Sequence, residues 1–220
     1  MNNFRNFHTV FISIQDKMII HQIFLRVSNK TINDYPCYVE GSALWQEFCS
    51  KNGWEYRLHT EIDESIMTEE ELDILNQGSK RYPFFAVDYY RLILLSKYGG
   101  MYVDLDVVAT AKFELIKDKD IIIGRSIDKG DNNFYVNNNI MKLTPELIEL
   151  LKQYSIQQTH EKLNMKVYET RKIRFFLHTV GAMMLARFCK KHKLSFCDDY
   201  DDYFIDLVQG AHFNDDGKKL

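Results

Sequence analysis

Proline, glycine and repeated sequence are all scarce in this chain. Its 220 residues include 3 prolines and 10 glycines, with no low-complexity run and no internal repeat. Long linkers and disordered segments depend on such compositions, so neither is expected. Because 45% of the residues are hydrophobic, the chain can bury a sizeable core, and we predict a single domain over residues 1–220.

Metal-binding cysteine pairs and long apolar runs are missing as well. The four cysteines form no C-x-x-C pair and have no histidine partner at zinc-finger spacing, so we expect reduced, buried thiols at Cys37, Cys49, Cys189 and Cys197. No apolar run approaches the ~20 residues of a membrane span. The N-terminus also lacks the apolar core and cleavage site of a signal peptide. These absences predict a soluble, cytoplasmic protein without a membrane span, for which peripheral membrane association stays possible.

Neither sign of charge is in large excess. The 28 basic and 31 acidic side chains leave a net charge of -3, which gives no general attraction to nucleic acid. We therefore expect no nucleic-acid partner, and any anionic ligand must be held by a local site.

Strand and helix patterns alternate along the chain, which predicts an α/β domain. The expected strands are residues 9–14, 18–25, 54–58, 101–108, 121–123, 134–136 and 205–208. The expected helices are residues 41–52, one opened by the capping box Thr68–Glu71, 83–98, one opened by Thr144-Pro145, and 171–191, with Met183 and Met184 in the core. Residues 198–202 are expected to form a solvated acidic loop.

The helix over residues 83–98 carries two charges on its apolar stripe. Asp88 and Arg91 are three positions apart on the face that should be buried. Burying either charge alone costs several kcal/mol, so the two must pair with each other or with a ligand in a polar cleft. A structural salt bridge and a binding site both remain open.

Two carboxylates follow this helix after a Gly-Gly break. Asp104 and Asp106 lie at positions i and i+2, so on a strand both would face the same way. Such a pair repels itself unless a proton or a cation intervenes, and Mn²⁺ or Mg²⁺ prefers these oxygen ligands. The alternative is a solvated acidic pair at a strand end. Three consecutive amides further on, Asn137-Asn138-Asn139, predict either a turn or the wall of a polar site. Near the C-terminus, His212 is a lone imidazole.

These residues resemble a conserved block of a known enzyme family. The block A-S-D-x-x-R-Y…L…Y-G-G-x-Y-x-D-x-D of sugar-nucleotide glycosyltransferases of family thirty-two is similar to Ala86-Val87-Asp88-Tyr89-Tyr90-Arg91, Leu95, Tyr98-Gly99-Gly100-Met101-Tyr102 and Asp104-Leu105-Asp106. Ile19-Ile20-His21-Gln22-Ile23 resembles the family's opening strand, and Trp54-Glu55-Tyr56-Arg57-Leu58 its second strand.

The resemblance implies a fold and a reaction. The fold is the GT-A type, an α/β architecture with a mixed, mostly parallel central sheet flanked by helices. The reaction moves a hexose-type sugar, with retention of configuration, from a nucleotide-diphosphate sugar to a glycan or other hydroxyl acceptor. A UDP- or GDP-sugar donor and a bound Mn²⁺ or Mg²⁺ are implied with it.

The resemblance also implies roles for individual residues. Asp104 and Asp106 would be the catalytic pair and would hold the metal, with His212 completing its shell. The donor would be bound by His21, Gln22, Asp88, Arg91, Asp104 and Asn138. The chain departs from the pattern in lacking the opening proline and the C-terminal Ser-Trp, in having His59 where a tryptophan is usual, and in having Gly181-Ala182 where Gly-Pro is usual.

Two other functions fit parts of the sequence. Asp104-Leu105-Asp106-Val107-Val108 also resembles the nucleophile strand of haloacid dehalogenase-like phosphatases, with Asp104 as nucleophile. In that family, however, the motif opens the domain rather than following a helix. The missing Ser-Trp tail would also suit a sugar-nucleotide-binding protein without turnover.

Overall fold

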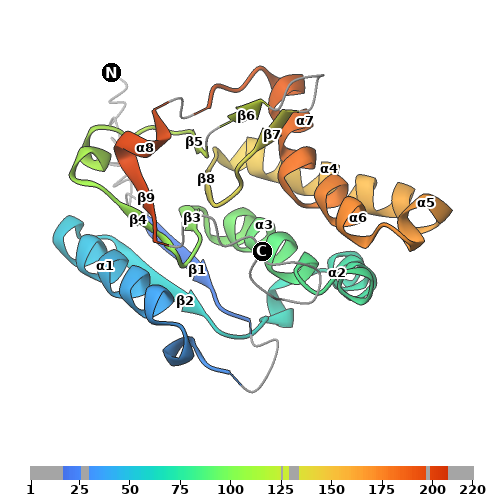
Figure 1. Ribbon diagram of the computed structural model, residues 1–220, viewed down its shortest axis with the longest axis horizontal. Helices are drawn as coiled ribbons and strands as arrows, with labels where there is room; N and C mark the ends of the chain where they lie inside the picture. Colours follow the sequence, from blue (N-terminus) through green and yellow to red (C-terminus); the bar gives the residue numbers. More distant parts are fainter. Residues whose placement is uncertain (1–16, 26–29, 125, 129–133, 197–198, 208–220) are drawn as a thin grey trace, which may run out of the picture.

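The computed structural model describes residues 17–25, 30–124, 126–128, 134–196 and 199–207 (Figure 1). Its central sheet has five strands in the order β2-β1-β3-β8-β5. Strands β2, β1 and β3 are mutually parallel, and β8 is antiparallel to both β3 and β5. Four strands therefore run in one direction, and the mixed, mostly parallel sheet that the sequence predicts is present.

The sheet strands are β1 (Ile19–Ile23), β2 (Glu55–His59), β3 (Met101–Val103), β5 (Ile122–Ile123) and β8 (Ile140–Lys142). Two smaller sheets pair β4 (Val107–Ala109) with β9 (Phe204–Asp206), and β6 (Ser126–Asp128) with β7 (Phe134–Val136). The helices are α1 (Pro36–Asn52), α2 (Glu69–Arg81), α3 (Phe85–Tyr98), α4 (Pro145–Leu163), α5 (Lys166–Glu169), α6 (Lys172–Thr179), α7 (Ala182–His192) and α8 (Tyr200–Tyr203). Short 3-10 turns cover Ile32–Asp34, Glu64–Ile66 and Ala111–Leu115.

Helices cover both faces of the central sheet, because its side chains alternate between two apolar clusters. Met101 and Val103 of β3 pack with Trp45 of α1 in one cluster. Tyr102, between them, joins the other cluster, which contains residues of α2, α3, α4, α6 and α7. In Figure 1, α1 accordingly lies along one side of the sheet and the larger helical group along the other.

Local sequence signals set several helix ends as expected. The Thr68 hydroxyl accepts from the Glu71 backbone N–H, and the Glu71 carboxylate accepts from the Thr68 N–H at 2.8 Å, which completes the capping box of α2. The Thr144 hydroxyl caps α4 by accepting from the Leu147 backbone N–H, with Pro145 at the first helical position. Gly99 ends α3, and Gly100 then adopts a φ of 86° that suits glycine.

The structure corrects three predictions. Residues 101–108 do not form one strand, because β3 and β4 belong to different sheets and a turn separates them. Residues 171–191 do not form one helix, because the chain leaves helical geometry at Val180 (φ -133°) and Gly181 then caps α7. Part of the expected acidic loop is instead the short helix α8, whose Tyr200 is buried.

Other predictions have mixed outcomes. Met184 lies in the core, whereas Met183 is half-buried. The expected strand at 9–14 lies outside the described residues. Within the described part of the chain, no helix has the length and apolarity needed to cross a membrane.

Candidate functional site

The two acids lie in a turn at the end of a buried strand. β3 ends at Val103, and the Val107 N–H donates to the Asp104 carbonyl at 3.2 Å, which closes the turn Asp104-Leu105-Asp106. Leu105 is buried and anchors the turn, while both acids are half-buried and lie at a solvent-accessible edge. The prediction that a strand aligns the two carboxylates is wrong, because the turn positions them instead.

Burial makes both carboxylates hard to ionise. The pKa of Asp106 is raised to about 6, first by burial and then by the charge of Asp104. The pKa of Asp104 is also raised, mainly by burial, although the Arg91 guanidinium and the Tyr102 hydroxyl act in the opposite direction. The charge of Asp206, on β9, adds to the repulsion at both acids. A cation bound among them would relieve this cost.

Side chains of β3 and α3 hold Asp104 in place. The Tyr102 hydroxyl donates to the Asp104 carboxylate at 2.5 Å. The Arg91 guanidinium lies 4.3 Å from the centre of the Tyr102 ring, which is a cation–π contact between two buried side chains. These contacts link α3 directly to the carboxylate turn.

Asp88 and Arg91 are buried partners, which is one of the two alternatives that the sequence leaves open. Arg91 forms an ion pair with Asp88 and donates to the carbonyl oxygen of Asn138, and the Asn138 amide donates to Asp88 at 2.9 Å. The side chains of Arg91 and Asp88 are only 4% and 8% exposed. Arg91 Nε has no hydrogen-bond partner among the described residues, so the cluster retains one unused buried donor.

A third carboxylate joins the site from the last described strand. Asp206 accepts from the Tyr200 hydroxyl at 2.8 Å and from the Asn139 amide at 3.3 Å. Asn139 also supports the turn, because its carbonyl accepts from the Asp104 N–H at 2.7 Å. The Leu207 N–H donates to the Asp106 carbonyl at 2.6 Å, which ties the end of β9 to the same turn.

The side chains of His21 and Gln22 form hydrogen bonds within the protein and are not exposed to a ligand. The Gln22 amide donates to the Asp104 carbonyl at 3.1 Å and accepts from the Tyr56 hydroxyl at 2.9 Å. His21 donates through Nε2 to the Gly99 carbonyl, and its Nδ1 accepts from His59 Nε2, both at 3.1 Å. Both side chains are fully buried, so they support the backbone around Gly99 and Asp104 from inside the protein.

An aromatic cluster stands beside the carboxylates. The rings of Tyr35 and Tyr38 stack at 5.2 Å, and Phe24 packs against both. Burial raises the pKa of Tyr38 to about 12, and the charges of Asp106 and Asp104 contribute to this rise. The three rings are half-buried, and Tyr38 is the one whose interaction with the acidic turn is recorded.

The two carboxylates suit a hard divalent cation that takes its remaining ligands from a substrate and from water. Within the described residues, no three His, Cys, Asp or Glu side chains are grouped closely enough to enclose a metal ion. Mg²⁺ sites commonly use one or two carboxylates and take the other ligands from phosphate and water. Asp104 and Asp106 fit that arrangement.

A known family matches this part of the chain. The family described as "Glycosyltransferase sugar-binding region containing DXD motif" matches residues 44–128, a stretch that is less than half of the chain. The match begins in α1 and contains α3 and the Asp104-Leu105-Asp106 turn. This stretch resembles a DXD glycosyltransferase region. The match supports a glycosyltransferase without naming family thirty-two or any donor.

Two solved structures match this chain. "PaToxG Glycosyltransferase" is 13% identical with a TM-score of 0.50, covering 80% of this chain and 69% of that one. A glycosyltransferase involved in the glycosylation of the major capsid of PBCV-1 is also 13% identical, covering 87% of this chain and 94% of that one, but its TM-score of 0.40 is too low to support an argument. No curated protein matches the sequence.

The structure joins most of the predicted site residues and adds others. Asp88, Arg91, Asn138, Asp104 and Asp106 form one connected group. His212, the predicted third metal ligand, lies outside the described residues. The sequence reasoning gave no role to Asp206, Tyr102 or the Tyr38 cluster. The predicted strand at 205–208 was the one signal that could have drawn attention to Asp206.

Proposed function

We propose that the protein is a metal-dependent glycosyltransferase, which moves a hexose-type sugar from a nucleotide-diphosphate sugar to a glycan or other hydroxyl acceptor. One observation carries the proposal: the half-buried Asp104 and Asp106 share a turn beside the buried Arg91, whose Nε is unpaired. Two acids and one such donor suit a diphosphate bound with a cation.

The leaving group explains why this arrangement suits the reaction. When the glycosyl bond breaks, negative charge develops on the departing diphosphate. Mn²⁺ or Mg²⁺ held at this site would supply positive charge to offset that negative charge without a proton donor. Asp106 and Asp104 are the residues that would hold the ion, and the Tyr102 hydroxyl fixes the orientation of Asp104.

The remaining residues would bind and align the donor. Arg91 would offer its unpaired Nε–H to a phosphate oxygen, while Asp88 and Asn138 keep the guanidinium plane in position. The exposed parts of Tyr35, Tyr38 and Phe24 would pack against a flat ring, either the base or a sugar face. Retention of configuration, the UDP or GDP base and the acceptor stay predictions.

The first test is Asp106→Asn, which removes a ligand charge at almost constant volume. We expect metal-dependent nucleotide binding to be lost and donor turnover to fall by about 100-fold or more, because the metal contributes several kcal/mol. The melting temperature should not fall, since the substitution removes a charge that is partly buried. Titration calorimetry with Mn²⁺ and UDP or GDP, with sugar release across a donor panel, measures both effects.

The matched control is Asp73→Asn on α2, where the carboxylate is exposed and accepts a hydrogen bond from Gln77. Its binding and turnover should equal those of the wild type. Unchanged metal binding in Asp106→Asn would defeat the proposed metal site. Nucleotide binding without sugar release or transfer on any donor would favour a non-catalytic binding protein, and phosphate release from phosphomonoesters would favour a phosphatase.

A further inference from the structure

Positive charge is concentrated in one stretch of the chain. Residues 162–196 contain nine of the 28 Lys and Arg residues but only one of the 31 Asp and Glu residues. Their net charge of +8 contrasts with -3 for the whole chain. The cations are Lys162, Lys166, Arg171, Lys172, Arg174, Arg187, Lys190, Lys191 and Lys193, and the acid is Glu169. Such a separation of charge favours an anionic partner.

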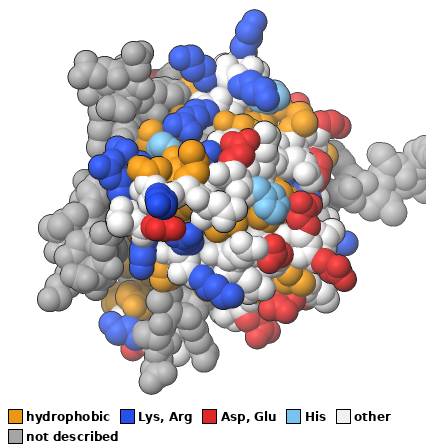
Figure 2. Space-filling view, turned by 90° about the vertical axis from the view of Figure 1, so that its right-hand side faces the viewer, with side chains coloured by type: hydrophobic (Ala, Val, Ile, Leu, Met, Phe, Trp, Pro, Cys, Tyr) orange, Lys and Arg blue, Asp and Glu red, His pale blue; other side chains and the backbone are white. Residues whose placement is uncertain are grey.

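Exposed aliphatic side chains lie among these cations. Met165, Val167 and Ile173 are 48%, 46% and 47% exposed, which is unusual for large apolar residues so close together. We give the name basic face to the exposed basic and apolar side chains around them, which are Met165, Lys166, Val167, Arg171, Lys172, Ile173 and Arg174; Glu169 and Thr170 are also exposed in this stretch. Figure 2 views this end of the molecule and shows Lys and Arg gathered with hydrophobic side chains toward its upper left, whereas most Asp and Glu lie along its right and lower edges.

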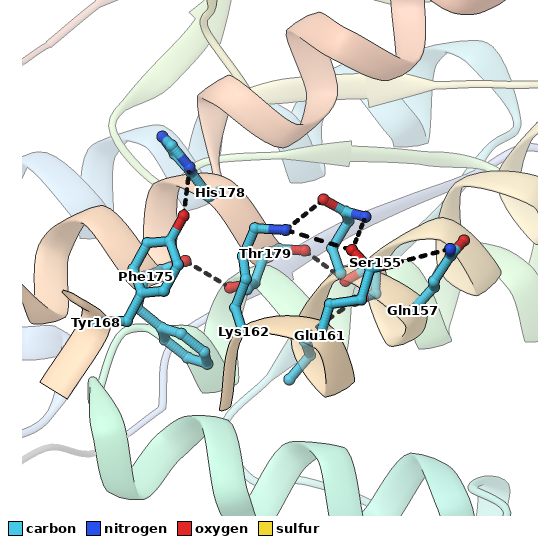
Figure 3. Close-up of polar contacts among 10 residues, drawn as sticks. Ser155, Gln157, Glu161, Lys162, Tyr168, Phe175, His178 and Thr179 are labelled. Carbon is cyan, nitrogen blue, oxygen red and sulfur yellow. Dashed lines mark hydrogen bonds and ion pairs between the residues drawn. The ribbon is translucent and has the colours of Figure 1, made fainter. Parts of the chain in front are cut away.

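The basic face is held on a rigid support. Tyr168 lies beneath it, buried, with its hydroxyl 3.0 Å from His178 Nδ1 (Figure 3). His178 Nε2 contacts the Met183 sulfur, which can only accept, so the Tyr168 hydroxyl donates to Nδ1. Ser155 of α4 donates to the Thr179 carbonyl at 2.8 Å, which joins α4 to α6. These contacts join α5 to α6 and α6 to α4 beneath the basic face.

The cations of the basic face are not neutralised locally. No ion pair of Lys166, Lys172 or Arg174 with a carboxylate occurs among the described residues, although other lysines of the chain have such partners. A hollow of about 290 Å³ adjoins the face at Asn164 and adds Lys80 and Arg81 of α2 to the same side. Arg81 donates to the Leu163 carbonyl at 2.7 Å, which fixes this neighbour.

We infer that the basic face docks on the surface of an anionic lipid bilayer, with Met165, Val167 and Ile173 entering the headgroup region and the surrounding cations contacting lipid phosphates and carboxylates. Amphipathic surface segments bind membranes through this combination of aliphatic and basic residues. Nucleic acid fits less well, because base stacking uses exposed rings, whereas the exposed apolar side chains of the basic face are all aliphatic.

The test is co-sedimentation with vesicles of phosphatidylcholine alone or mixed with phosphatidylserine, at about 0.1 M salt where charges act over ~10 Å. We expect partition onto the mixed vesicles only. The double variant Lys166→Gln, Lys172→Gln should partition roughly 25-fold less, because each basic residue near the surface contributes about 5-fold. The double variant Val167→Ser, Ile173→Ser should also bind more weakly, and its defect should persist in high salt.

The matched controls are Lys51→Gln and Leu44→Ser on α1, at exposed positions across the sheet. Both should sediment like the wild type, and all variants should keep the wild-type melting temperature. Equal partition onto both vesicle types, or an equal defect in the α1 controls, would overturn the inference. So would tight binding of single-stranded RNA that depends on Lys166 and Lys172 without any vesicle binding. No donor is present, so either result leaves the proposed transferase reaction untouched.

Discussion

Arg91 of the helix α3 makes three different contacts, and the one with Tyr102 leads to the carboxylate turn. It pairs with Asp88, donates to the Asn138 carbonyl and lies over the Tyr102 ring. A planar, five-donor cation can make all three at once, whereas an ammonium is a point charge. The geometry of the whole site therefore depends on the shape of this side chain as well as on its charge.

We expect Arg91→Lys to lower donor turnover by about 10- to 100-fold, because charge-assisted hydrogen bonds contribute ~1.5–3 kcal/mol each. Lysine keeps the positive charge but loses the fork and the stacking. Steady-state kinetics with the preferred donor measures the loss. Arg57→Lys is the control, since Arg57 also lies over a tyrosine ring, that of Tyr98, but pairs with the partly exposed Glu55. Equal kinetics for both variants would return Arg91 to a purely structural role.

At the scale of elements, α1 determines where the acidic turn lies. A Cβ atom on Gly41 of α1 would stand 2.0 Å from the Leu105 carbonyl oxygen, so only glycine permits this close approach. Alanine normally favours a helix interior over glycine by about 1 kcal/mol. Here the clash should reverse that sign.

We expect Gly41→Ala to destabilise the protein by more than about 1 kcal/mol and to lower donor turnover, because the turn must move away from α1. Urea unfolding and sugar release measure the two effects. Glu40→Ala, at the exposed neighbouring position, tests whether alanine is tolerated in α1 and should change neither. A stabilised and fully active Gly41→Ala variant would contradict the close packing.

The sequence predicts the elements better than it predicts how they connect. Periodicity and caps locate β1, β2, α2, α3 and α4, because these signals are local. The Asp104-Leu105-Asp106 turn was mistaken for strand because β-prone residues stand on both sides of it. The pairing of β4 with β9, which produces the turn, depends on residues about one hundred positions away.

The site residues divide in the same way, into those with local sequence signals and those brought in by long-range contacts. Asp88, Arg91 and the two acids could be found because their spacing is short and their charges fall on an apolar pattern. Asp206 approaches them through the pairing of β4 and β9 and through hydrogen bonds with Tyr200 and Asn139. No single-sequence pattern encodes such a long-range contact. The internal partners of His21 and Gln22 were missed for the same reason.

At the scale of the whole molecule, buried titrating groups act on stability in opposite directions. Burial lowers the pKa of His21 to about 3 and also lowers that of His59, so the folded protein holds both neutral. The unfolded chain takes up protons below about pH 6.5, and stability from this pair falls as the pH falls. Asp106 has a raised pKa of about 6, so its destabilising charge is lost on acidification.

We therefore expect Asp106→Asn to lose stability more steeply than the wild type as the pH falls from about 6 to 4, by up to about 1.4 kcal/mol per pH unit. The variant keeps the two histidines but lacks the opposing carboxylate. Urea unfolding at several pH values, with chelator present, measures the slopes. Asp73→Asn should follow the wild type, and parallel curves for Asp106→Asn and the wild type would contradict the raised pKa.

The pairing of β4 with β9 also affects how the protein is made. Asp106 and Asp206 are one hundred residues apart in the chain. The acidic turn is therefore synthesised long before β9, which pairs with the strand that follows the turn. At ~5–20 residues per second, a growing chain carries the acidic turn for roughly 5–20 s without β9. During that interval Trp45 and Phe113 lack their neighbour Phe204, and their cluster stays open on the ribosome. Chaperones that bind exposed aromatic surface would meet the nascent protein on this side of the sheet.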